Sequence, residues 1–130
     1  MKTIQEIRNI LNHANGTEKY HRVSTIRNAP IATNGVVALA EAAECFWLLD
    51  AIISYSNDKR IPNPNFQVWK LTLTKDDDKK DAVLESLNDN KKVVIRQNIE
   101  FTDFPLDEIT LWVVGGEPQG LNVIMLPSEY

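Results

Sequence analysis

One stretch of the chain decides the fold: Asn34-Gly-Val-Val-Ala-Leu-Ala-Glu-Ala-Ala-Glu-Cys-Phe-Trp-Leu-Leu-Asp-Ala-Ile-Ile-Ser-Tyr55. Read as a helix of about 100° per residue, it is apolar around nearly its whole circumference, which predicts a single long buried helix. Thr33 or Asn34 supplies an oxygen that can cap its first turn. We expect the helix to end near Ser56, because the two prolines of residues 57–65 cannot continue it.

A single carboxylate, Asp50, falls in the middle of the apolar face of this helix. A buried charge needs a partner, because burial without one is costly. We therefore expect Asp50 to pair with Arg22, Arg27 or Arg96, or to accept N–H groups from the 57–65 loop, and so to fix how the helix docks. The alternative is a small enzyme or ligand-binding domain with a pocket between helix and sheet. Its lining would be His21, Trp47, Asp50 and Tyr55.

Upstream of the long helix, Thr3 and Glu6 have the spacing of a capping box, which predicts a short amphipathic helix at the amino terminus. Residues 17–31 could hold one edge strand. From Phe66 onward the hydrophobic period changes from helical to alternating, and turn residues punctuate the chain at hairpin distances. The expected strands are 67–74, 82–87, 93–101, 109–114 and 121–126. This pattern predicts an α+β fold, with an antiparallel sheet of about five strands packed against one long buried helix and one short N-terminal helix.

Length and composition indicate one globular domain covering residues 1–130, with 43% hydrophobic and 25% charged residues. The net charge of −4 argues against direct binding to nucleic acid, which depends on clustered Lys and Arg. No stretch has the length of a membrane span or the pattern of a secretory signal, so we expect a cytoplasmic protein. The single cysteine, Cys45, excludes an intramolecular disulfide and is expected to be a buried thiol. No motif indicates a cofactor, a metal site or a catalytic residue.

The residues most suited to binding are acidic. The charge run from Lys75 to Asp81 is expected at a solvated hairpin tip, and further carboxylates lie on later strands and turns. Trp112 alternates out of phase with the apolar residues around it, which favours a position on the opposite side of the sheet, as a contact surface. The alternatives are that a second layer or a second copy of the chain covers it, or that the register of the strand is reversed. The candidate binding residues are Asp76, Asp77, Asp78, Asp81, Asp89, Glu100, Asp107, Glu108 and Trp112.

Several short sequence motifs are distributed over most of the chain. They are Thr33-Asn-Gly-Val36, Leu39-Ala-Glu41, Phe46-Trp-Leu-Leu-Asp-Ala-Ile52, Phe66-Gln-Val-Trp69, Thr102-Asp-Phe-Pro-Leu106 and Leu126-Pro-Ser-Glu-Tyr130. In combination they resemble a family of small proteins of unknown function found in bacteria and on phages or other mobile elements. The resemblance implies a compact stand-alone protein from a mobile-element neighbourhood, where small acidic proteins often act by binding.

Charge and this resemblance together lead to a functional expectation. We expect a small acidic non-enzymatic binding protein, such as a phage-encoded inhibitor of a host defence complex of the anti-CRISPR kind. Its partner would be a basic nucleic-acid-binding host complex, because an acidic surface is steered toward positively charged channels. No cofactor and no membrane contact are expected, and a homo-oligomer is compatible with the same surface.

Overall fold

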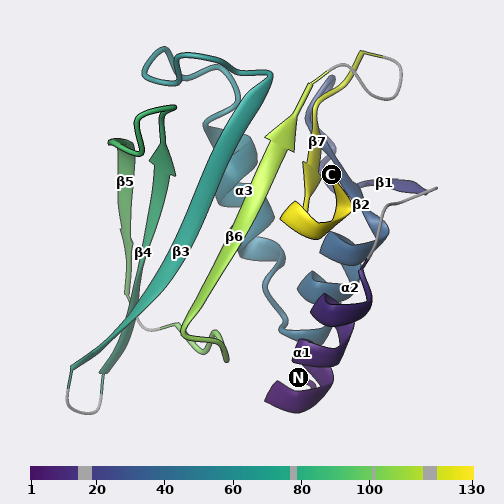
Figure 1. Ribbon diagram of the computed structural model, residues 1–130, viewed down its shortest axis with the longest axis vertical. Helices are drawn as coiled ribbons and strands as arrows, with labels where there is room; N and C mark the ends of the chain where they lie inside the picture. The colour runs from purple at the N-terminus through teal and green to yellow at the C-terminus, as the bar shows by residue number, and fades with distance from the viewer. Residues whose placement is uncertain (15–18, 77–78, 101, 116–119) are drawn as a thin grey trace.

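A computed structural model describes residues 1–14, 19–76, 79–100, 102–115 and 120–130, with backbone alone at 75, 76 and 79. Within these residues seven strands form one sheet in the order β1-β2-β7-β6-β3-β4-β5, with α3 lying behind β3 and β6 in Figure 1. The elements are α1 (Ile4–His13), β1 (Tyr20–Arg22), β2 (Ile31–Thr33), α2 (Asn34–Ala42), α3 (Phe46–Ser54), β3 (Phe66–Asp76), β4 (Lys79–Leu87), β5 (Val93–Ile99), β6 (Glu108–Val114), β7 (Val123–Met125) and the 3-10 turn η1 (Pro127–Glu129).

The α+β class is confirmed, but the predicted architecture was wrong in two respects. The described sheet has seven strands and is mixed, because β2 runs parallel to β7 while the other neighbouring strands are antiparallel. Residues 20–33 supply β1 and β2, which extend the sheet beyond β7. Their three-residue length left too little alternation for a sequence pattern to reveal.

The prediction of one long helix was also wrong, because residues 34–54 form two helices, α2 and α3. Glu44 adopts a left-handed backbone conformation with φ of 52°. The Cys45 N–H then donates to the carbonyl of Ala40 at 2.9 Å. This six-to-one bond is the Schellman ending of a helix, in which the left-handed position is usually a glycine. With Glu at that position, the sequence carries no signal for the break.

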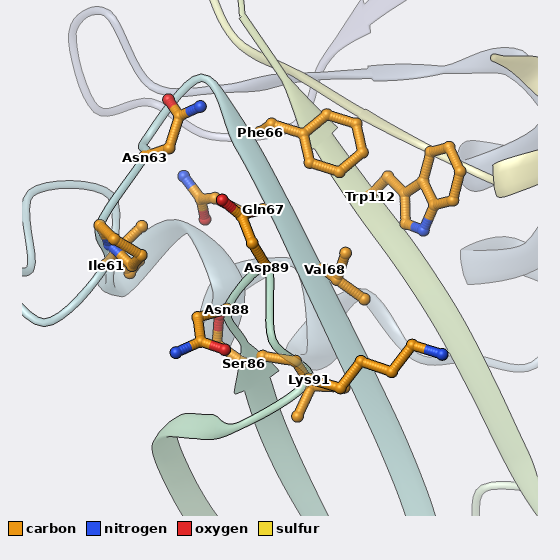
Figure 2. A pocket seen from close by; sticks show the side chains of 12 residues that line it. Ile61, Asn63, Phe66, Gln67, Val68, Ser86, Asn88, Asp89, Lys91 and Trp112 are labelled. Carbon is orange, nitrogen blue, oxygen red and sulfur yellow. The ribbon is translucent and has the colours of Figure 1, made fainter.

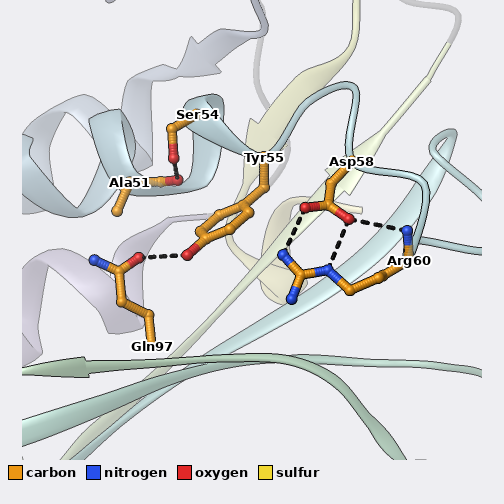
Figure 3. A network of polar contacts seen from close by, with 6 residues as sticks. All are labelled: Ala51, Ser54, Tyr55, Asp58, Arg60 and Gln97. Atoms are coloured by element: carbon orange, nitrogen blue, oxygen red, sulfur yellow. Dashed lines mark hydrogen bonds and ion pairs between the residues drawn. The ribbon is translucent and has the colours of Figure 1, made fainter.

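The core lies between α2, α3 and one face of the sheet. Trp69 and Leu111 are each 1% exposed on this face, and Cys45 is equally buried beneath the helices, as expected for the thiol. The ring of Tyr55 stacks on Trp69 with centroids 5.4 Å apart. Figure 3 shows that the Tyr55 hydroxyl also reaches β5, where it donates a 2.8 Å hydrogen bond to Gln97 Oε1. The end of α3 is thereby fixed to both the middle and the edge of the sheet.

Two predicted helix caps are confirmed. Thr3 Oγ1 accepts the Glu6 N–H, and the Glu6 carboxylate accepts the Thr3 N–H, which completes the capping box of α1. Thr33 caps α2, since its hydroxyl oxygen accepts the Val36 N–H at 3.3 Å. Across the described part of the chain, no helix has the length and apolar character needed to span a membrane.

Candidate functional site

The predicted acidic residues gather mainly at one end of the sheet, the lower end in Figure 1. Backbone hydrogen bonds place them there: Leu73 N–H donates to the Asp107 carbonyl and Thr102 N–H to the Lys80 carbonyl. We call the acidic side chains at this end the acidic end. Its described members are Asp81, which is half-buried, and Glu100, Asp103, Asp107 and Glu108, which are exposed. Lys80 is also exposed there, so the negative charge is partly offset.

The remaining acidic candidates do not belong to this group. Asp77 and Asp78 lie outside the described residues, as does the side chain of Asp76. Asp89 lies at the opposite end of the sheet, in the turn between β4 and β5. Glu108 forms an ion pair with Lys70 at 3.5 Å, but both side chains are exposed, so the pair contributes little to stability.

Trp112 lies on the sheet face opposite the core, as predicted, and it is half-buried by two other rings. Its ring centroid is 5.4 Å from that of Phe66 and 5.5 Å from that of Tyr130. We call these three rings the aromatic cluster. Phe66 is 37% exposed and Tyr130 76% exposed, so the cluster offers rings to solvent. Exposed aromatic groups of this kind mark contact surfaces.

The structure does not support the alternative pocket around Asp50, because the prediction that Asp50 is buried was wrong. The side chain is exposed on α3, and the buried face of that helix consists of Leu48, Leu49, Ile52 and Ile53. The sequence pattern places Asp50 on the buried face only if residues 34–55 form one continuous helix, whereas α3 starts with a different phase after the break at Glu44. The ion pairs expected with Arg22, Arg27 or Arg96 are not formed in the described structure, and Arg96 approaches Glu85 instead, at 3.9 Å.

The other residues of that alternative pocket are dispersed among different contacts. Trp47 is half-buried and meets Phe104 edge to face, with ring centroids 6.5 Å apart. Tyr55 packs on Trp69 inside the core. His21 lies on β1, where Nε2 contacts Asn34 Oδ1 at 2.5 Å. These contacts have structural roles and do not assemble acid and base groups around one cavity.

The buried carboxylate of the described chain is Glu129, which is 7% exposed. It accepts hydrogen bonds from the Thr33 hydroxyl at 2.7 Å, from the Leu126 N–H at 3.0 Å and from the Gly35 N–H at 3.3 Å. These partners include the first turn of α2, where a negative charge is favourable. This role was not predicted, because the partners Thr33 and Gly35 lie far from Glu129 in the sequence.

Cys45 is the single thiol, and its surroundings make it unreactive. Burial raises the pKa of its thiol to about 12, and the nearby Asp103 carboxylate adds to the shift. A thiolate is the reactive form of cysteine, so this residue is poorly suited to nucleophilic chemistry at neutral pH. It acts as a small apolar core residue.

Fold and site together define an α+β protein with an acidic end and an aromatic cluster on the open face of its sheet. A family model, described as a family of unknown function (DUF6876), matches residues 5–130, so the chain belongs to that family. No curated protein and no solved structure matches the chain.

Three residues of the two surfaces were missed as binding candidates. Asp103 joins the acidic end, and Phe66 and Tyr130 join Trp112 in the aromatic cluster. Phe66 and Trp112 could have been associated through their alternation on strands that proved to be neighbours. Tyr130 could not, because its position depends on the turn η1 being anchored by Glu129.

Proposed function

We propose that this protein is a non-enzymatic binding protein that engages a basic surface of a partner protein through its acidic end. The proposal rests on one observation above all: Glu100, Asp103, Asp107 and Glu108 are exposed together where three segments of the chain meet. Carboxylates grouped at one end of a molecule raise the rate of encounter with positively charged surfaces. The net charge of −4 acts in the same direction.

The chemistry of such a partner follows from the charge. A strongly basic protein surface is usually a nucleic-acid channel, so an acidic protein that occupies it competes with DNA or RNA. We propose a basic nucleic-acid-binding host complex as the partner, and inhibition of a host defence system by a phage or mobile-element protein as the biological role. The resemblance of the sequence motifs to a family associated with mobile elements supports this choice.

A competition pulldown from bacterial lysates tests the proposal. The tagged protein should retain a nucleic-acid-binding complex at low salt and lose it when salt or competing DNA or RNA is added. The variant Glu100→Lys/Asp103→Lys should lose the partner. The control Glu41→Lys/Asp50→Lys makes the same change in net charge at exposed positions on the helices and should retain it.

Two outcomes contradict the proposal. One is recovery of no nucleic-acid-binding complex from any lysate. The other is equal loss of the partner in both charge-reversed variants, because net charge alone would then explain the retention. A second copy of the chain covering the aromatic cluster stays a separate prediction, which light scattering tests directly.

A further inference from the structure

The sheet opens into a pocket where β3 begins. β3 pairs with β6 from Phe66 onward, but it pairs with β4 only from Val68, which lies opposite Leu87. At this point β4 shifts its register with β5 and turns away into residues 88–92. The gap between the start of β3 and the end of β4 contains a pocket of about 370 Å³, a volume typical of small-molecule sites.

One side of this pocket is aromatic and apolar. Phe66 and Trp112 form a wall, with their rings tilted by 55° to each other, and Val68 and Leu87 add aliphatic surface. All four belong to the sheet face opposite the core or to its margin. Two rings in this arrangement offer a face and an edge to a third ring, a geometry that aromatic groups prefer.

The charged residues of the pocket lie in the turn after β4 and point in different directions. In Figure 2 the Lys91 side chain extends past Val68 toward Trp112, whereas the Asp89 carboxylate points toward Gln67. Among the residues that the structure describes, neither the Lys91 ammonium group nor the Trp112 indole N–H has a hydrogen-bond or ion-pair partner. The aromatic side of the pocket therefore presents two unused donors, one of them cationic.

The turn that carries Lys91 is held in place by its own hydrogen bonds. Asn88 Oδ1 accepts the N–H groups of Asn90 and Lys92, both at 2.9 Å. The Lys91 N–H donates to the Asn88 carbonyl at 2.9 Å. The backbone of the turn is thus fixed before any ligand arrives, which lowers the entropic cost of binding.

We propose that this pocket binds an aromatic carboxylate. The ring of the ligand lies against Phe66 and Trp112, and its carboxylate accepts hydrogen bonds from the Lys91 ammonium group and the Trp112 indole N–H. Asp89 repels an anion at the other side and so gives the ligand one orientation. The site is separate from the acidic end and does not depend on the function proposed for it.

Ligand titration followed by NMR of the indole N–H signals tests this inference. The chain has three tryptophans, and the variant Trp112→Phe identifies the signal of Trp112. Indole-3-propionate should move that signal in a saturable way, with a dissociation constant below about 1 mM. Indole-3-propionamide has the same shape without the charge and should bind roughly tenfold more weakly.

A second arm identifies the source of the ligand. A short peptide ending in Trp with a free carboxylate is compared with the same peptide amidated at its carboxy terminus. If the peptide with the free carboxylate binds more tightly than the amidated peptide, and indole-3-propionate binds weakly, the natural ligand is a protein terminus. If indole-3-propionate binds tightly, the natural ligand is a small molecule. Both results support the shared chemistry.

Variants of the turn complete the test. Lys91→Met should weaken binding of indole-3-propionate roughly tenfold, whereas Lys92→Met, an exposed neighbour that does not line the pocket, should leave it unchanged. Asp89→Asn should tighten binding. The proposal is overturned if the acid and the amide bind equally, if Lys91→Met and Lys92→Met behave alike, or if no saturable shift occurs.

Discussion

The Thr33 hydroxyl donates a 2.7 Å hydrogen bond to Glu129 Oε1 and so joins residues that are 96 positions apart in the chain. Thr33 is the N-cap of α2, and Glu129 is the last residue of η1. The same carboxylate accepts the Gly35 and Leu126 N–H groups. One buried acid therefore links the first turn of α2 to the segment that contains η1. It also accepts N–H groups that would otherwise lack a partner.

The first prediction concerns the loss of this carboxylate. Glu129→Ala leaves the Thr33 hydroxyl and two N–H groups without their acceptor, so the free energy of unfolding should fall by about 2–3 kcal/mol. Glu129→Gln keeps an acceptor oxygen and should cost less. Urea denaturation measures both effects. Asp50→Ala is the control, since this exposed acid should change stability by no more than about 0.5 kcal/mol; an equal loss in Asp50→Ala would contradict the assignment.

The second prediction uses the close approach of Gly35 to the same side chain. A Cβ atom at Gly35 would lie 2.8 Å from Glu129 Oε1, so Gly35→Ala must displace the carboxylate from its hydrogen bonds. We expect Gly35→Ala to lower the free energy of unfolding by about 1–2 kcal/mol, although Ala within a helix is otherwise more stable than Gly by about 1 kcal/mol.

A double-mutant cycle separates these two contributions. In the background of Glu129→Ala the obstructing carboxylate is gone, so Gly35→Ala should be neutral or stabilising. Chemical denaturation of the four proteins gives the coupling energy. If Gly35→Ala destabilises both backgrounds equally, contact with Glu129 is not the reason for the glycine.

The comparison of Asp50 with Glu129 shows what the sequence could not provide. The pattern correctly indicated a strongly apolar helical region, but it assigned the buried acid to Asp50, which is exposed. The error came from Glu44, whose left-handed conformation splits the helix without the usual glycine. The burial of Glu129 could not be predicted from the residues around it, because its partners Thr33 and Gly35 lie in a distant part of the chain.

The strands were more predictable than their assembly. Strict alternation located β3, β4, β5, β6 and β7 close to their observed bounds, and it placed Trp69 inside and Trp112 on the other face. Alternation does not say which strands are neighbours, so the parallel pairing of Ile31 with Val123 was not foreseen. The aromatic cluster and the acidic end both depend on such pairings, and for that reason only part of each was identified from the sequence.

The third prediction concerns the reactivity of Cys45. With a pKa of about 12 and 1% exposure, the thiol should not react with an aromatic disulfide reagent at pH 8 while the protein is folded. Labelling should follow the rate of unfolding and accelerate in urea. As a control, Cys45→Ala/Ser54→Cys carries its thiol at an exposed position and should be labelled at once. Rapid labelling of the unaltered protein without denaturant would show that the core around Cys45 opens readily.

The fourth prediction concerns acid stability and the pair shown in Figure 3, in which the Asp58 carboxylate accepts hydrogen bonds from the Arg60 side chain and backbone N–H. These bonds, together with the charge of Arg60, lower the pKa of Asp58 to about 2. A lowered pKa in the folded state means that the unfolded chain takes up the proton first, near its ordinary pKa of about 3.9. The pair therefore stabilises the protein above about pH 4, and this contribution disappears as the pH falls toward 2.

The measurement is the urea midpoint of the unaltered protein and of Asp58→Asn across this pH range. The unaltered protein should have the higher midpoint at pH 7, and the two midpoints should converge between about pH 4 and pH 2. Arg60→Met should also converge with the unaltered protein, because removal of the side-chain donors raises the pKa of Asp58 toward its ordinary value, while the backbone N–H of residue 60 still donates. The double variant should match Asp58→Asn, since that change already removes the charge that Arg60 binds. A midpoint difference between the unaltered protein and Asp58→Asn that is constant with pH would mean that Asp58 acts through its shape and not through its charge.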